Sequence, residues 1–279
     1  MVQVQSEVTN EDGGNQTSRD IRNIEGLISF GLQKYDANSY DFVALMKDSF
    51  SAAFDFNGEL NNLHQLLQSP KFPAEHKAFY DKTQLFGKGD RNSIFIKKFH
   101  EAWDSDPKWE ELYHRFIRDV VQPVLCPGEK EIVVQKTPNI RIGIPGVSNI
   151  GRLPETDPSP DFIGLHCDGE HGHPPQEKNI IVPLTKMTST NSLFFEPRPK
   201  SGLPCTHYEL LETDPGKFFY FYGNGCKHFN KVNNTGMTRI SFDFRIIPFS
   251  QYDAEYDSLS RTSSKLFRIG DYYSKISCS

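Results

Sequence analysis

The chain has 279 residues, enough for one large domain with a substantial core, and no long Gly/Ser-rich or Pro-rich linker divides it. Its 31 Lys and Arg against 36 Asp and Glu give a net charge of −5, so it lacks the basic balance that nucleic acids favour. Five scattered cysteines without a C-x-x-C pair argue against a disulfide framework and favour a reducing compartment.

The sequence shows the features of neither a secretory signal nor a membrane-spanning segment. Residues 1–20 lack the basic and apolar regions of a secretory signal, and we interpret them as a flexible tail. No apolar run approaches the roughly 20 residues that span a bilayer. We therefore expect a soluble protein with no membrane or nucleic-acid partner. Its location is cytoplasmic by default, with targeting to an organelle as the open alternative.

Helical patterns dominate the first half of the chain. In the clearest case, apolar residues recur at three- and four-residue spacing over 109–121. Asp106 can cap this helix and Pro107 suits its first position, while we expect Pro123 and the following Pro-Gly pair to end it. Shorter helices are expected over residues 40–54, 58–68 and 73–85.

After residue 128 the period of the apolar residues changes to two, which is typical of strands. Six short runs rich in Ile, Val and Phe alternate with turn residues: 132–135, 140–144, 180–184, 193–195, 217–222 and 239–247. This arrangement predicts a β sandwich or barrel, supported on one face by the helices.

His166, Asp168 and His228 form a candidate metal site. On an extended segment residues 166 and 168 project to the same face, so both can reach one ion while Cys167 faces away. His228 follows a later strand. Two imidazoles and one carboxylate can hold one face of iron(II) and leave its other positions open, which is the ligand set of non-haem oxygenases.

Arg239 and Ser241 form a candidate co-substrate site. The Asn-rich turn over 233–236 predicts a hairpin that places His228 nearly opposite Ser241, with Arg239 on the same strand face as Ser241. A guanidinium binds a carboxylate bidentately and stays charged when desolvated. We interpret the pair as an anchor for the distal carboxylate of 2-oxoglutarate, with Arg245 as a second candidate farther along the strand.

These motifs resemble those of the iron(II)/2-oxoglutarate-dependent dioxygenases over roughly residues 141–245. Longer blocks look like the subgroup around the streptomycin-biosynthesis G protein, which works on small polar metabolites, and like the red-algal kainoid synthases. Those blocks are LHCDGEHGHPPQEKNIIVPLT, TNSLFFEP and KHFNKVNNTGMTRISFDFR. Because halogenases of the superfamily replace the carboxylate ligand with a small residue, Asp168 argues against halogenation.

The resemblance implies an α+β protein whose core is a double-stranded β-helix (jelly roll, cupin-like) with supporting N-terminal helices. We expect one domain over 21–279, divided into helical support (21–125), jelly-roll core (130–250) and C-terminal extension (251–279). The resemblance also implies iron(II) on the two histidines and Asp168, with 2-oxoglutarate and O₂ as co-substrates.

The implied reaction begins with hydrogen abstraction from a small, polar, amino-acid-like metabolite. Hydroxylation or oxidative ring closure of a prekainoid to kainic acid would follow. Arg141 is the first candidate for a substrate carboxylate, because it shares one strand face with Asn139. Glu170 could receive an amine, and Lys186 or Arg198 a second carboxylate.

Two other interpretations stay open. A jelly-roll hydrolase or isomerase could use the same two histidines and aspartate around zinc, although it would not need a dicarboxylate anchor. A non-catalytic β-sandwich could bind a small ligand and keep its histidines for structure. His171 and His173 lie close to the metal motif, and we interpret them as polar residues of a loop over the site.

Overall fold

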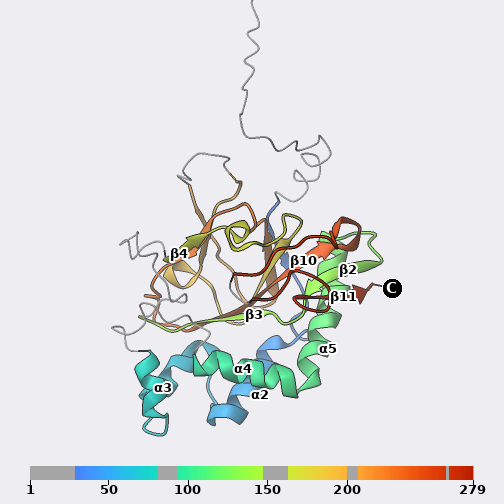
Figure 1. The fold of residues 1–279 in the computed structure, drawn as a ribbon. Helices are drawn as coiled ribbons and strands as arrows, with labels where there is room; N and C mark the ends of the chain where they lie inside the picture. The colour runs from blue at the N-terminus through green and yellow to red at the C-terminus, as the bar shows by residue number, and fades with distance from the viewer. Residues whose placement is uncertain (1–28, 81–92, 147–162, 200–206, 262–263, 279) are drawn as a thin grey trace, which may run out of the picture.

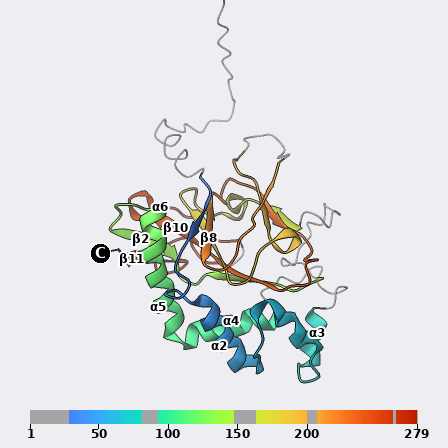
Figure 2. The same ribbon diagram turned by 180° about the vertical axis from the view of Figure 1, so that it is seen from behind.

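The computed structural model describes residues 29–80, 93–146, 163–199, 207–261 and 264–278. A helical layer lies against one side of a β-core (Figure 1), and the same arrangement is seen from behind in Figure 2. The predicted tail over 1–20 falls outside the described residues. No helix in the part of the chain that the structure describes is long and apolar enough to cross a membrane.

The helical layer contains the helices expected in the first half of the chain and one more, α4, which the sequence patterns did not single out. It comprises α2 (Phe42–Phe54), η1 (Leu60–Gln68), α3 (Ala74–Phe79), α4 (Ile94–Ser105), α5 (Pro107–Phe116), η3 (Ile117–Val121) and α6 (Gln122–Leu125). The segment expected as a helix over 58–68 is a 3₁₀ helix. Residues 81–85, the end of another expected helix, lie outside the described residues.

The helix that begins at Pro107 continues past Pro123, so the expected end at that proline is wrong, but it ends at Leu125, just before the predicted Pro127-Gly128 pair. As predicted, Asp106 caps α5, since its side chain accepts a hydrogen bond from the backbone of Lys108. The π-helical η3 follows, and α6 begins after it with Pro123 in its first turn. A proline is tolerated there because it follows a π-helical turn, where the regular i→i−4 hydrogen bonds are already interrupted.

Two antiparallel sheets form the β-core. The larger sheet has the order β1 (Gly31–Lys34), β8 (Lys217–Phe221), β5 (Lys178–Pro183), β10 (Arg239–Pro248), β2 (Glu131–Gln135) and β11 (Tyr273–Ser277), with β3 (Asn139–Gly143) pairing β10 beside β2. The smaller sheet has the order β4 (Ile163–His166), β9 (His228–Asn230), β6 (Leu193–Phe195) and β7 (Glu209–Leu210). Three short 3₁₀ segments complete the described elements: η4 (Asp168–His171), η5 (Ser189–Asn191) and η6 (Phe249–Gln251).

From β4 to β10 the chain alternates between the sheets except at β6 and β7, which are neighbours in the smaller one: β4, β6, β7 and β9 belong to the smaller sheet, and β5, β8 and β10 to the larger. This alternation is the double-stranded β-helix, so the predicted jelly roll and α+β class are confirmed. Two strands lie outside the predicted core. β1 precedes the helices and β11 lies in the C-terminal extension, and both join the larger sheet.

The predicted hairpin between β9 and β10 is wrong. His228 pairs with His166 and Phe195 of the smaller sheet, whereas Ser241 pairs with Arg141 and Pro183 of the larger. The intervening segment crosses between the sheets instead of reversing within one. It is held there by a buried asparagine, Asn233, whose amide donates to the carbonyls of Gly143 and Met237 at 2.8 and 2.7 Å.

The two faces of β10 have different chemistry, as its alternation predicts. Ile240, Phe242 and Phe244 belong to the main hydrophobic core. The Phe242 ring lies 4.9 Å from that of Phe42 in α2, and the Phe244 ring lies 5.0 Å from that of Tyr113 in α5. The opposite face carries Arg239, Ser241, Asp243 and Arg245, all buried. The helical layer therefore supports a strand whose polar face is turned toward the interior of the jelly roll.

Candidate metal centre

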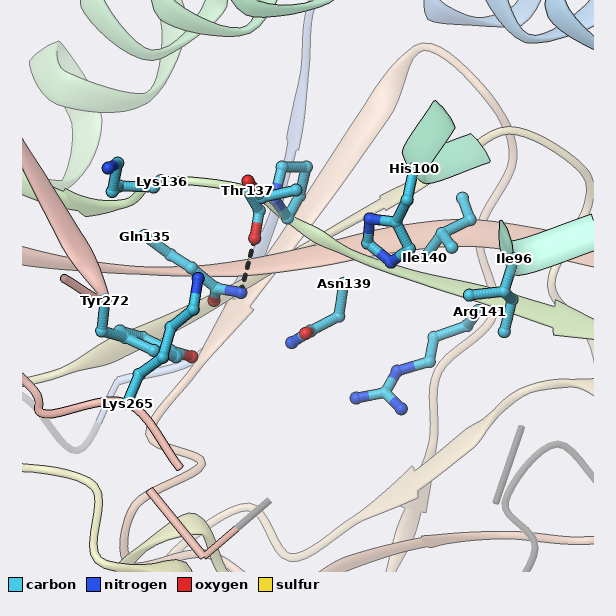
Figure 3. A pocket seen from close by; sticks show the side chains of 11 residues that line it. Ile96, His100, Gln135, Lys136, Thr137, Asn139, Ile140, Arg141, Lys265 and Tyr272 are labelled. Carbon is cyan, nitrogen blue, oxygen red and sulfur yellow. Dashed lines mark hydrogen bonds between the residues drawn. The ribbon is translucent and has the colours of Figure 1, made fainter. Parts of the chain in front are cut away.

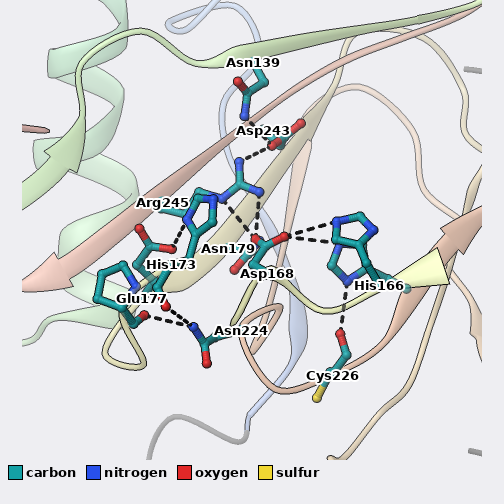
Figure 4. Close-up of polar contacts among 12 residues, drawn as sticks. Asn139, His166, Asp168, His173, Glu177, Asn179, Asn224, Cys226, Asp243 and Arg245 are labelled. Atoms are coloured by element: carbon teal, nitrogen blue, oxygen red, sulfur yellow. Dashed lines mark hydrogen bonds and ion pairs between the residues drawn. The ribbon is translucent and has the colours of Figure 1, made fainter. Parts of the chain in front are cut away.

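His166, Asp168 and His228 meet inside the jelly roll. Figure 4 shows His166 beside Asp168, with Arg245 and Asn179 around that carboxylate. His166 ends β4 and lies opposite His228 in β9, and their ring centroids are 4.4 Å apart. Asp168 begins η4, two residues later. Its Oδ1 lies 3.4 Å from His166 Nε2 and 3.6 Å from His228 Nε2. One ligand atom from each residue lies within 4.8 Å of the others, which is a spacing that a single metal ion can bridge.

Backbone carbonyls orient both imidazoles. His166 Nδ1 is hydrogen-bonded to the carbonyl of Gly164, and His228 Nδ1 to that of Cys226 at 3.0 Å. Gly164 has a φ of 69° where the β4–β9 register shifts, a conformation that glycine adopts readily. With Nδ1 as the donor, each ring presents the lone pair of Nε2 to the centre. Burial and the nearby His166 lower the pKa of His228 to about 4, so its ring is neutral at pH 7.

Arg245 and Asn179 hold the carboxylate of Asp168. Its Oδ2 accepts hydrogen bonds from Arg245 Nη2 at 2.8 Å, from Arg245 Nε at 3.2 Å and from Asn179 Nδ2 at 2.6 Å. Oδ1 is the oxygen that faces the histidines. Burial alone would raise the pKa of Asp168, but the charge of Arg245 and the contact with His166 hold it well below its usual value. Asp168 is therefore ionised, with one oxygen anchored and the other directed toward the two histidines.

Gly223 makes room for this anchor. A Cβ atom at this position would lie 2.5 Å from Asn179 Nδ2, the donor to Asp168. The carbonyl of Gly223 also accepts a hydrogen bond from the Asp168 backbone at 2.8 Å. Only glycine allows the turn after β8 to approach Asn179 so closely.

His173 is buried, not part of a polar loop as we expected. Its ring packs against Phe267 with centroids 4.4 Å apart, and its Nδ1 is hydrogen-bonded to Glu177 at 2.7 Å. Glu177 is fully buried and also accepts a hydrogen bond from Tyr273 at the start of β11. Asp168, His173 and Glu177 are close enough to form a second potential ligand set. Because both oxygens of Glu177 are already hydrogen-bonded, this set fits a cation less well than the first.

Arg239 is 3% exposed and lines the same cavity as His166 and His228. Its Nε and Nη2 donate to Ser241 Oγ at 3.2 and 3.1 Å, and its Nη1 donates to Asn230 Oδ1 at 2.8 Å. Burial and the charge of Arg141 lower its pKa to about 10, so it remains protonated at pH 7. Among the described residues, no carboxylate lies within ion-pair distance of Arg239. A buried cation of this kind calls for an anionic ligand.

One cavity lies between the two candidate metal-binding histidines and Arg239. It is lined by Arg141, His166, Asn179, Ile181, Leu193, Phe221, His228, Asn230, Arg239, Asp243 and Arg245. Sequence patterns pointed to five of these positions: both histidines and the three arginines. Asn179 and Asn230 were missed, because an asparagine on a strand carries no local signal of function.

The candidate substrate residues separate into two groups. Arg141 lines the cavity and donates to Asp243 Oδ1 at 2.8 Å. Glu170, Lys186 and Arg198 are exposed and do not line it. Of the four, only Arg141 is placed to contact a substrate beside the metal centre.

No protein-family model matches the chain. The streptomycin biosynthesis protein StrG of Streptomyces griseus is 27% identical over 188 residues, which cover 67% of this chain and 78% of that protein. Solved structures also align with this chain, among them the following two. The α-ketoglutarate-dependent carbocyclase SnoK from nogalamycin biosynthesis is 10% identical, covering 94% of this chain and 97% of SnoK with a TM-score of 0.49. EctD from S. alaskensis is 14% identical, covering 95% and 88% with a TM-score of 0.47.

Proposed function

We propose that this protein is an iron(II)/2-oxoglutarate-dependent oxygenase that removes hydrogen from a small polar metabolite. The observation that carries the proposal is one cavity lined by both histidines of the His166–Asp168–His228 cluster and by Arg239, a buried arginine without an anionic partner among the described residues. The cluster alone would also suit a zinc hydrolase or isomerase. Arg239 and Ser241 favour the oxygenase, because a second, distal carboxylate has to be held only when 2-oxoglutarate is the co-substrate.

The ligand atoms fit an iron site. His166 Nε2, His228 Nε2 and Asp168 Oδ1 would hold one face of the ion, which leaves the positions toward the cavity for reactants. Bound iron would supply the activation of dioxygen, coupled to oxidative decarboxylation of 2-oxoglutarate. The task of the chain is to place the co-substrate and the substrate around that ion and to exclude side reactions.

Arg239 would hold the distal carboxylate of 2-oxoglutarate through its fork, with Ser241 adding a hydroxyl. Asn230 fixes the other arm of the guanidinium, so the arginine is oriented before the ligand arrives. The apolar residues Phe221 and Leu193 line the same cavity and limit the water around the reacting groups.

The substrate we propose is small, polar and amino-acid-like, with one carboxylate bound at Arg141. StrG, by its name, belongs to streptomycin biosynthesis, and this supports a metabolite over a macromolecule. Hydroxylation and oxidative ring closure begin with the same hydrogen abstraction. Ring closure of a prekainoid to kainic acid is the finer candidate, since it needs only that the pocket hold the reacting carbon against a neighbouring alkene.

The test is oxygen-dependent formation of succinate from 2-oxoglutarate by the iron-loaded protein, with prekainoids and other amino-acid-like metabolites as candidate substrates. Arg239→Met should lower the rate at least a hundredfold at fixed 2-oxoglutarate, because a carboxylate loses its charged, bidentate partner. Arg118→Met is the matched control, since Arg118 is exposed on η3. Equal rates in the two variants, or no succinate from any preparation that binds iron, would contradict the proposal.

A further inference from the structure

The C-terminal extension packs against the segment that carries the metal ligand Asp168. This segment, residues 168–177, begins with η4 and leads into β5. From the extension, the Tyr256 hydroxyl donates to the carbonyls of Gly172 and His173 at 3.1 and 3.3 Å. The last fifth of the described chain, to which the sequence patterns assigned no role, therefore holds a loop of the metal centre.

Glu177 forms the buried part of this contact. It is fully buried, and one of its oxygens accepts a hydrogen bond from the Tyr273 hydroxyl in β11. Its other oxygen lies 2.7 Å from Nδ1 of His173, whose ring packs on Phe267 and lies edge-on to Tyr272. Burying a carboxylate is costly unless its oxygens are satisfied. Glu177 is satisfied from both sides, so it joins the extension to the loop.

The same pair of residues reaches Asp168. The backbone N–H of His173 donates to the Asp168 carbonyl at 3.3 Å, which closes the loop onto its own first residue. One carboxylate oxygen of Glu177 lies within 4.8 Å of one of Asp168. A carboxylate at that distance adds to the negative potential at the place where a cation would bind. Both the position of Asp168 and its attraction for a metal ion therefore depend on Glu177 and its partners.

The extension also forms one wall of a neighbouring cavity. Figure 3 shows Lys265 and Tyr272 on one side of this cavity, with Asn139 and Arg141 farther along it. Arg141 lines the metal cavity as well. The docked extension thus shapes the surroundings of the metal centre in two places.

We propose that Glu177, His173 and Tyr273 are positioning residues of the metal centre, through which the C-terminal extension fixes Asp168 in the orientation that binds the ion. Because coupling between two sites is reciprocal, an ion held by the three ligands stabilises the docked extension in turn. The inference rests on the proposed function only in requiring that His166, Asp168 and His228 hold a metal ion.

The first test titrates the metal-free protein with cobalt(II), which accepts the same nitrogen and oxygen ligands as iron(II), by calorimetry and by the visible absorption of the bound ion. Glu177→Gln keeps the size of the side chain and removes its charge, and should weaken cobalt binding on the order of tenfold. Tyr273→Phe removes one hydroxyl and keeps the ring, and should weaken binding by a smaller factor. Tyr252→Phe is the matched control and should leave the affinity unchanged, because the Tyr252 hydroxyl binds the Ile269 backbone within the extension.

Hydrogen exchange measures the reciprocal effect. Cobalt binding should slow exchange of the backbone amides over residues 266–277 on the order of tenfold in the wild-type protein and in Tyr252→Phe. In Glu177→Gln the slowing should be clearly smaller. A merely structural role of Glu177 would lower the free energy of unfolding and leave both the cobalt affinity and this slowing as in the control.

The positioning role and the proposed function fail in different ways. Cobalt bound as tightly by Glu177→Gln and Tyr273→Phe as by Tyr252→Phe would overturn the positioning role and leave the proposed function standing. If Glu177→Gln does not fold, Tyr273→Phe decides the same question. A wild-type protein that binds no cobalt would overturn the proposed function and the positioning role together.

Discussion

Replacing Arg245 by leucine removes the main partner of the Asp168 carboxylate. Asp168 is 2% exposed, and Arg245 donates two of the three side-chain hydrogen bonds to its Oδ2. Breaking a buried ion pair from one side costs about 3–5 kcal/mol, because the remaining charge stays buried without compensation. We expect Arg245→Leu to lower the free energy of unfolding of the metal-free protein by that amount at pH 7, measured by urea denaturation.

Two further variants make this prediction decisive. Lys47→Leu breaks an exposed pair with Glu59 and should cost less than about 1 kcal/mol. The double change Arg245→Leu/Asp168→Asn removes the stranded charge, so it should be more stable than Arg245→Leu alone. An Arg245→Leu variant that costs no more than Lys47→Leu, or that gains no stability from Asp168→Asn, would refute the stabilising role of the Arg245–Asp168 ion pair.

Two other changes test the surroundings of the metal centre. Gly223→Ala places a Cβ atom 2.5 Å from Asn179 Nδ2 and should push that amide off Asp168; metal titration should show about tenfold weaker affinity, and an unchanged affinity would refute the close approach. Burial opposes the low pKa of Asp243, but Arg141 and Arg245 lower it to about 2, so its contribution to stability is present above about pH 4 and lost as pH falls toward 2. The difference in unfolding free energy between wild type and Asp243→Asn should therefore shrink by about 2 kcal/mol from pH 5 to pH 2; a constant difference would show that Asp243 has an ordinary pKa.

Local sequence patterns were sufficient to predict much of the fold and to predict that the metal-ligand side chains converge. The alternation in β10 correctly divided Arg239 and Ser241 from Phe242 and Phe244, because a strand places neighbours on opposite faces whatever it pairs with. For the same reason the two-residue spacing in the His166 motif directed both side chains to one side.

Pairing between strands could not be predicted in the same way. The turn before β10 has hairpin composition, but β9 and β10 lie in different sheets, and this choice depends on distant partners such as Asn233 with Gly143. The sequence also did not predict that Arg245 and Asn179 donate hydrogen bonds to Asp168. Each binds Asp168 across the fold, 77 and 11 residues away along the chain, and no local spacing encodes such a contact.

The most direct test of the central claim is the anaerobic visible spectrum of the protein with iron(II) and 2-oxoglutarate. We expect a metal-to-ligand charge-transfer band that is lost in His228→Ala and weakened in Arg239→Met at equal 2-oxoglutarate, with Arg118→Met unchanged as the control. Tight binding of zinc without any such band for iron would contradict it, and would favour a hydrolase or isomerase built on the same three ligands.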